Sequence, residues 1–148
     1  MAVERAAILY RLNPFKPFSD ISEQLELVPE KEMDNFSERG FLAFVNGDWY
    51  FGEFERGVCN GYGVLFWAKG DFGRELSWHP SQTEKYTGDW YTGYFRDGII
   101  HGEGTYHFSQ NVTQYNRWEG NWESAKPVGT GILWHSEINW SREEFPLS

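Results

Sequence analysis

The stretch that decides the fold reads Tyr50-Phe51-Gly52-Glu53-Phe54-Glu55-Arg56-Gly57-Val58-Cys59-Asn60-Gly61-Tyr62-Gly63. The same frame recurs as Tyr91-Thr92-Gly93-Tyr94-Phe95-Arg96-Asp97-Gly98-Ile99-Ile100-His101-Gly102-Glu103-Gly104. A weaker third copy reads Trp118-Glu119-Gly120-Asn121-Trp122-Glu123-Ser124-Ala125-Lys126-Pro127-Val128-Gly129-Thr130-Gly131. Self-similarity at a spacing of tens of residues is typical of architectures that stack one supersecondary unit. We therefore expect a chain built from stacked copies of this unit.

Rings and glycines alternate in each copy in a way that indicates strands. Residues two apart on a strand share a face, so each opening strand carries a ring, a glycine and a ring on one face. The returning strand is expected to set a second bare patch against the first, and rings that lie flat over bare backbone offset the weak strand propensity of glycine. The residues with this structural role are Tyr50, Gly52, Phe54, Gly61, Gly63, Tyr91, Gly93, Phe95, Gly102, Gly104, Trp118, Gly120, Trp122, Gly129 and Gly131.

The turns of the copies follow from the same frame. Gly57 and Gly98 fall where a turn needs positive φ. His101 is expected to satisfy backbone groups of its turn. In the third copy Ala125 replaces the turn glycine and Pro127 lies beside it, which leaves the geometry of that turn open. Upstream, Asn46-Gly47 separates two apolar runs, a pattern that predicts a hairpin with a type I′ turn and a degenerate leading copy.

The frame resembles the MORN repeat, a family of short β-hairpin units. The resemblance covers residues 40–134 and implies an all-β fold, an elongated antiparallel meander of stacked hairpins. We expect a repeat domain at residues 40–140, with repeat cores at 50–70, 91–111 and 118–134. Tyr50 and Tyr91 lie 41 residues apart, more than one repeat of the family. Residues 71–85 are therefore expected to be an insertion or a copy that lost its signature.

The flanks differ in composition from the repeats. Residues 1–39 lack glycine and are expected to form an extended, partly helical N-terminal arm. Pro14 and Pro17 favour extended backbone over residues 13–18. Ser19 or Asp20 can cap a short helix over residues 21–27. The arm is either a solvated tail or a tether to a larger assembly, and residues 141–148 are expected to be a C-terminal tail.

Composition and charge narrow the classes of function. Aromatic residues make up 19% of the chain, so the core must be built largely from rings, which strands accommodate well. The formal charge of −9 argues against nucleic acid as a partner, because binding would have to overcome repulsion by phosphates. Cys59 is the single cysteine, which excludes an intrachain disulfide and fits a reducing compartment.

Segments for targeting and membrane insertion are not found in the sequence. The N-terminal residues lack the apolar stretch of a signal peptide, and no apolar run has the length of a transmembrane helix. We expect an intracellular protein, either cytoplasmic or associated with the cytoskeleton or an organelle, and not a secreted one.

Catalysis and metal binding find no support in the motifs. The four histidines are His79, His101, His107 and His135, and their spacing matches no known type of metal site. Glycine pairs such as Gly61 and Gly63 precede strands rather than helices, which excludes a phosphate-binding loop. No serine lies on a nucleophile elbow. We expect no enzyme activity, no cofactor and no metal.

The face opposite the ring-and-glycine face is the candidate for binding. A solvated face of an antiparallel sheet alternates to polar residues, yet here it stays apolar in the early copies and turns polar later, from Glu103 to Glu123. Either the arm or residues 71–85 cover it within the monomer, or a partner helix or extended peptide docks there. The predicted partner-binding residues are Trp49, Phe51, Tyr62, Val64, Phe66 and Tyr94.

Three functions fit these observations. The first is a non-catalytic protein-binding scaffold or accessory subunit, since the resemblance implies roles in cytoskeletal, ciliary and membrane-junction assemblies. The second, also implied by the resemblance, is a module that binds phosphoinositides or anionic membranes by peripheral contact, and the charge of −9 disfavours it. The third is carbohydrate binding by aromatic rows on an acidic sheet.

Overall fold

The computed structural model describes residues 7–12, 25–68, 88–108, 115–135 and 140–145. These residues form ten strands and one short helix. The elements are β1 (Ala7–Leu12), β2 (Leu25–Leu27), α1 (Glu30–Met33), β3 (Arg39–Phe44), β4 (Trp49–Glu55), β5 (Val58–Trp67), β6 (Asp89–Arg96), β7 (Ile99–His107), β8 (Tyr115–Glu123), β9 (Lys126–His135) and β10 (Trp140–Phe145).

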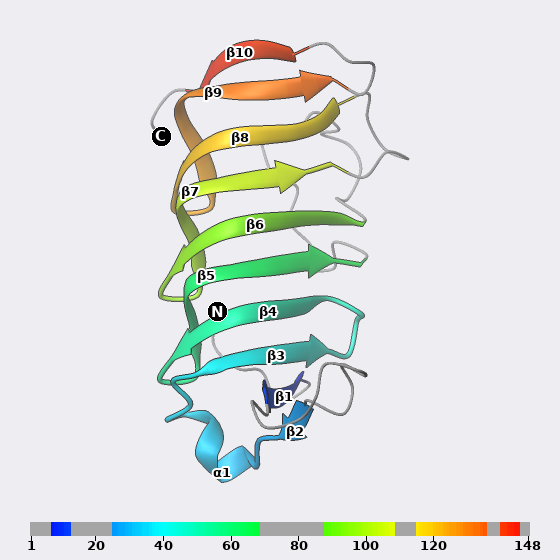
Figure 1. Cartoon of the computed structure of the whole chain (residues 1–148), viewed down its shortest axis with the longest axis vertical. Helices are drawn as coiled ribbons and strands as arrows, with labels where there is room; N and C mark the ends of the chain where they lie inside the picture. Colours follow the sequence, from blue (N-terminus) through cyan, green and yellow to red (C-terminus); the bar gives the residue numbers. More distant parts are fainter. Residues whose placement is uncertain (1–6, 13–24, 69–87, 109–114, 136–139, 146–148) are drawn as a thin grey trace.

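One antiparallel sheet contains all the described strands, in the order β10-β9-β8-β7-β6-β5-β4-β3-β1-β2. From β3 to β10 each strand pairs with the next along the chain, whereas β1 lies beside β3 and β2 forms the edge. The strands stack along the long axis of the molecule, with α1 beside β2 at one end (Figure 1). The predicted all-β antiparallel meander is confirmed.

The prediction of a partly helical N-terminal arm is wrong. Residues 25–27 of the predicted helix form β2, which pairs with β1 in the register Leu12↔Leu25. The physical reason is that β1 offers unpaired backbone groups at the sheet edge, and strand pairing satisfies them where a short isolated helix would not. The proposed caps at residues 19 and 20 lie outside the described residues. Five of the six residues of β10 belong to the predicted tail, and they pair with β9.

Rings lie flat over glycine pairs on the buried face. A Cβ at Gly63 would lie 2.5 Å from ring atoms of Tyr50, and one at Gly104 would lie 2.1 Å from Oη of Tyr91. Trp118 takes the same position over Gly131. The hydroxyl of Tyr50 donates to the carbonyl of Glu53 at 2.7 Å. Only a residue without a side chain leaves room for these rings.

A bulge in each repeat bends the strands. Gly52 pairs with Gly63 and Phe54 pairs with Cys59, so one residue of β4 lies opposite three residues of β5. Gly61 lies inside this bulge with φ of +99°, and Gly102 has φ of +90° in the equivalent bulge of the second repeat. The sequence places these two glycines in the bare patch, but their role is a left-handed backbone at the bend.

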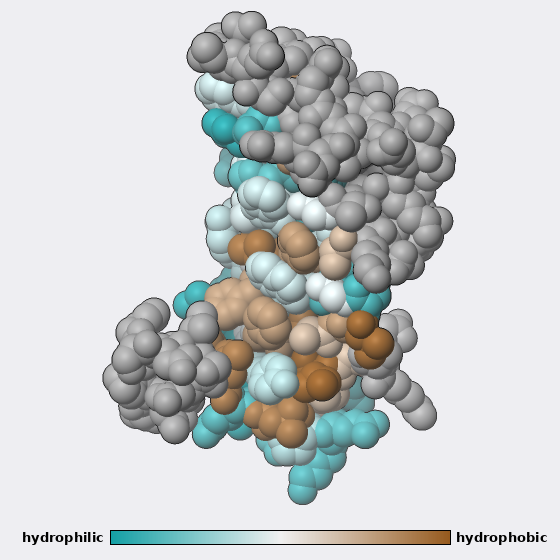
Figure 2. All heavy atoms as spheres, turned by 90° about the vertical axis from the view of Figure 1, so that its right-hand side faces the viewer, coloured by the Kyte–Doolittle hydropathy of each residue, from teal (hydrophilic) through white to brown (hydrophobic). Residues whose placement is uncertain are grey.

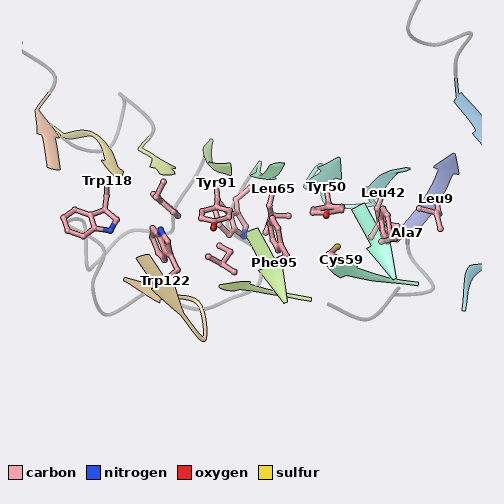
Figure 3. Close-up of a cluster of buried hydrophobic side chains, with 14 of the residues drawn as sticks. Ala7, Leu9, Leu42, Tyr50, Cys59, Leu65, Tyr91, Phe95, Trp118 and Trp122 are labelled. Atoms are coloured by element: carbon pink, nitrogen blue, oxygen red, sulfur yellow. The ribbon is translucent and has the colours of Figure 1, made fainter. Parts of the chain in front are cut away.

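The bend brings more rings onto the buried face. Phe95 packs edge-on against Tyr50 at 5.0 Å and against Tyr91 at 5.3 Å, and Trp122 packs edge-on against Tyr91 at 5.5 Å. Figure 3 shows these side chains in one row that continues to Leu42 and Leu9. A single-layer sheet thus obtains a continuous core by folding each strand over its own rings.

Backbone hydrogen bonds link each hairpin turn to the preceding unit. The N–H of Gly98 donates to the carbonyl of Cys59 at 2.8 Å, and the N–H of Ala125 donates to Ile100 at 3.0 Å. The N–H of Gly57 donates in the same way to Phe36 at 2.8 Å. The segment after α1 therefore takes the place of a preceding repeat and caps the stack.

Three turns share one conformation and a fourth differs. Arg56 and Gly57 have φ of 51° and 78°, as a type I′ turn requires, and Ser124 and Ala125 follow with 51° and 66°. The third repeat therefore keeps the turn despite its alanine. The type I′ turn predicted at Asn46-Gly47 is wrong. Gly47 alone has positive φ there, because its N–H closes a turn onto the carbonyl of Phe44 within a three-residue loop.

Candidate functional site

The outer face of the sheet, opposite the ring-and-glycine face, is the candidate site. Strand register aligns its side chains in rows that cross the sheet. The first row runs from Ala43 through Trp49, Phe66, Trp90, His107 and Arg117 to Trp134. The second row runs from Tyr10 through Phe41, Phe51, Val64, Thr92, Thr105 and Glu119 to Ile132.

Neighbouring rings in the first row stack across strands. The centroids of Trp49 and Phe66 lie 5.5 Å apart with 22° between the planes, and Trp49 also stacks on Phe41 at 5.6 Å. Trp90 stacks on His107 at 4.6 Å and 10°. Such cross-strand ring pairs stabilise the sheet, and the ring of Trp49 stacks on both Phe41 and Phe66.

The six predicted partner-binding residues lie together on this face. Tyr62 and Tyr94 are directly opposite each other in register, and they are 52% and 49% exposed. The remaining four are half-buried: Trp49, Phe51, Val64 and Phe66. Figure 2 shows apolar side chains gathered over the lower middle of the molecule, with hydrophilic ones both at its lower end and toward the β9 end.

The described N-terminal elements do not cover this face. β1 and β2 extend the sheet at its edge beside β3, and α1 lies at the end of the stack. Part of the predicted arm and the whole of the predicted insertion at residues 71–85 lie outside the described residues. Whether those segments cover the face within the monomer stays a prediction.

Sequence reasoning missed Trp90, which is 38% exposed and extends the aromatic surface onto β6. The signal that could have found it is a longer repeat frame: Gly47-Asp48-Trp49-Tyr50 recurs as Gly88-Asp89-Trp90-Tyr91. Sequence reasoning also missed Tyr10 and Phe41 on β1 and β3, which have no counterpart in the frame.

The aspartates of that longer frame are buried and serve the fold. Asp48 Oδ1 accepts a hydrogen bond from the N–H of Ala68 at 2.7 Å. Asp89 Oδ2 accepts one from the hydroxyl of Tyr106 at 2.8 Å. Asp48 directly precedes β4 and Asp89 is the first residue of β6, so each buried aspartate is followed by a tryptophan on the outer face.

The face becomes polar toward β8 and β9. Arg117 Nε donates to Glu119 Oε1 at 2.8 Å, and this bond lowers the pKa of the carboxyl group. The guanidinium carbon of Arg117 lies 4.4 Å from the ring centroid of Trp134. Burial, followed by the charge of Arg117, lowers the pKa of His107 from 6.5. Charge is therefore paired at this end, and the aromatic character fades.

The residues that metal binding or nucleophilic chemistry would use include His101 and Cys59 within the part of the chain that the structure describes. Among the residues that the structure describes, no group of three or more His, Cys, Asp and Glu side chains could hold a metal ion. Burial raises the pKa of Cys59 to about 12, so its thiol stays protonated. His101 lies 3.3 Å from Arg96 rather than against turn backbone, a role that Asn60 takes by accepting from the N–H of Asp97 at 3.2 Å.

The repeats identify the class of the protein. The model of the MORN repeat matches residues 50–72 and 91–113, which begin at the two tyrosines that lie over glycine pairs. The chain contains MORN repeats over these residues. No curated protein matches it significantly. MORN repeats occur in scaffold and membrane-binding proteins, and the family is generally non-enzymatic. No helix among the described residues is long and apolar enough to cross a membrane.

Proposed function

We propose that the chain is a non-catalytic protein-binding scaffold or accessory subunit, which docks a partner on the aromatic part of its outer face. The observation that carries this proposal is the outer face across β3 to β6, where stacked rings are partly exposed on a sheet whose core lies on the other face. Contiguous exposed apolar surface of this kind marks interaction sites in soluble proteins.

The anatomy of the surface supports a protein as the occupant. Aromatic residues are enriched at the centres of protein interfaces and polar residues at their rims. Here the half-buried rings lie centrally, with half-exposed Tyr62 and Tyr94 on one side and charged residues beyond. Rings already stacked on their neighbours lose little conformational freedom on binding. The proposed compartment is intracellular, in keeping with the buried thiol of Cys59.

Binding to anionic membranes is the alternative function, because MORN repeats also occur in membrane-binding proteins. Net charge disfavours it: anionic lipids attract clusters of lysine and arginine, and the chain carries 13 basic against 22 acidic residues. The aromatic face and the net charge therefore favour a protein partner.

Site-specific photo-crosslinking tests the proposal. A benzophenone amino acid replaces Phe51 in cells that express the chain natively, and crosslinked proteins are identified by mass spectrometry. Phe51 is suitable because it is half-buried between Phe41 and Arg39 on the outer face. We expect one protein to be crosslinked at this position and to disappear when Tyr62→Glu is added, which places a charge beside the rings.

The control places the same crosslinker at Glu30 on α1, which lies beside β2 at the end of the stack and does not cover the outer face. Tyr62 is half exposed, so Tyr62→Glu should leave the circular dichroism spectrum and the thermal midpoint nearly unchanged. Equal labelling from Phe51 and Glu30 would contradict the proposal. Unfolding by Tyr62→Glu would assign the face to the monomer core.

A further inference from the structure

A groove of about 540 Å³ crosses the outer face from β5 to β8. Thr92, Thr105 and Glu119 of the second row lie on one side of it. The residues two positions away on the same strands lie on the other side: Tyr94, Glu103 and Asn121. Three strand intervals of about 4.8 Å give it a span of about 14 Å, the length of about four residues of extended chain. Its lining residues are Tyr62, Thr92, Gly93, Tyr94, Glu103, Gly104, Thr105, Glu119, Gly120 and Asn121.

Two tyrosines form one end of the groove. The rings of Tyr62 and Tyr94 meet edge to face, with centroids 5.4 Å apart and 82° between the planes. About half of each side chain is exposed, and both residues lie in the register of the β5 and β6 pair. Such an arrangement offers a ring face to a ligand, and ring faces attract cations.

The ionisable groups that line the groove, apart from the tyrosines, are the carboxylates of Glu103 and Glu119. Glu103 is exposed, and its carboxylate makes no ion pair with a described residue. Glu119 forms an ion pair with Arg117, whose guanidinium group lies over the ring of Trp134 on β9. The carboxylate of Glu53 lies beside Tyr62, where it accepts the N–H of that residue. The tyrosine end of the groove therefore has the carboxylates of Glu53 and Glu103 nearby, with Arg96 two residues after Tyr94 on β6.

We propose that this groove binds an extended, cationic segment of a protein partner, with an arginine or lysine side chain against Tyr62 and Tyr94 and its charge beside Glu103. The proposal rests on the proposed function and names the class of partner. A ring face and a carboxylate attract the same cation, and a guanidinium group can stack and donate in parallel. The same carboxylates repel a phosphorylated lipid headgroup, which makes an anionic membrane a poor occupant of this groove.

Fluorescence anisotropy on the full chain tests the groove. The probe is a fluorescein-labelled ten-residue peptide of alternating arginine and serine, and its matched neutral peptide carries glutamine for arginine. We expect saturable binding of the cationic probe, weakened about tenfold or more by Glu103→Gln and by Tyr94→Ala. Glu30→Gln removes the same charge on α1 and should leave the affinity within about twofold, because α1 lies beside β2 at the end of the stack, whereas the groove crosses β5 to β8.

Four outcomes would overturn the groove proposal. They are no binding of the cationic probe, equal weakening by Glu103→Gln and Glu30→Gln, equal binding of the neutral peptide, and binding of cellohexaose or of phosphatidylcholine and phosphatidylserine vesicles in place of the peptide. Circular dichroism of each variant excludes loss of fold as the cause. A partner crosslinked at Phe51 that Glu103→Gln retains would leave the proposed function standing while the groove proposal fails.

Discussion

The first two repeats and the third share the rings over glycine pairs and the turn contacts, and they differ on the outer face. All three lay a ring over a glycine pair and send a turn N–H to the preceding unit. The buried hydrogen bond between Asp89 and Tyr106 belongs to the second repeat, since these residues correspond to Asp48 and Leu65 in the first repeat and to Asn116 and Leu133 in the third. The rings of the outer face also give way to charged pairs. Packing constrains the buried face in every copy, whereas the outer face is free to differ along the stack.

Gly104→Ala in the second repeat is expected to lower the stability of the chain more than Gly129→Ala in the third. The added Cβ would lie 2.1 Å from Oη of Tyr91, so the ring must leave its place between Phe95 and Trp122. We expect the free energy of unfolding to fall by about 3 kcal/mol or more. Urea denaturation followed by tryptophan fluorescence measures the loss.

The control is Gly129→Ala in the third repeat. Nothing lies within 4 Å of its added Cβ, and its φ of +70° makes left-handed backbone the remaining cost. That cost is about 1 kcal/mol. Equal losses for the two substitutions would show that backbone conformation, rather than the ring, sets the need for glycine.

Tyr106→Phe tests the hydrogen bond that the third repeat lacks. The substitution removes the hydroxyl that donates to Asp89 Oδ2 at 2.8 Å, where both residues are fully buried. We expect a loss of about 1–3 kcal/mol, since a buried carboxylate loses a donor. Thermal and urea unfolding check it, and Tyr94→Phe on the outer face is the control with no expected loss. A Tyr106→Phe chain as stable as the parent would contradict this role of the hydroxyl.

The sequence predicts the fold of the region that consists of repeats. Alternating rings and glycines predict strands, faces and the meander, because period-two packing is local information. β1 and β2 could not be found in this way, since β1 pairs with β3 and β2 pairs with β1, and this pairing depends on a sheet edge built by residues distant in sequence. Trp90 could have been found from the repeated Gly-Asp-Trp-Tyr, whereas the groove depends on strand bends at the bulges.

Ala125→Gly in the third repeat is expected to raise the stability of the chain. Ala125 has φ of 66° at the turn position that glycine holds in the other repeats. Glycine adopts this backbone without the clash of Cβ, so we expect the free energy of unfolding to rise by about 1 kcal/mol. The reciprocal control is Gly98→Ala, with a similar loss. A stability unchanged by Ala125→Gly would mean that the greater freedom of glycine in the unfolded chain offsets the relief.

The smallest expected effect lies at His107, where the aromatic row meets the polar end. Burial and the nearby Arg117 lower the pKa of His107 from 6.5, with Glu119 opposing in part. The unfolded chain therefore binds a proton at higher pH than the folded chain does. The stability contributed by neutral His107 is present above pH 6.5 and is lost as the pH falls below it.

We expect the thermal midpoint of the parent chain to fall as the pH is lowered from 7.5 to 5 by about 2 °C more than that of His107→Asn. Comparing the slopes cancels the titration of the shared carboxylates. Parallel slopes for the parent and His107→Asn would contradict this prediction. They would mean that the His107 ring, stacked on Trp90, accepts a proton as freely in the folded chain as in the unfolded chain.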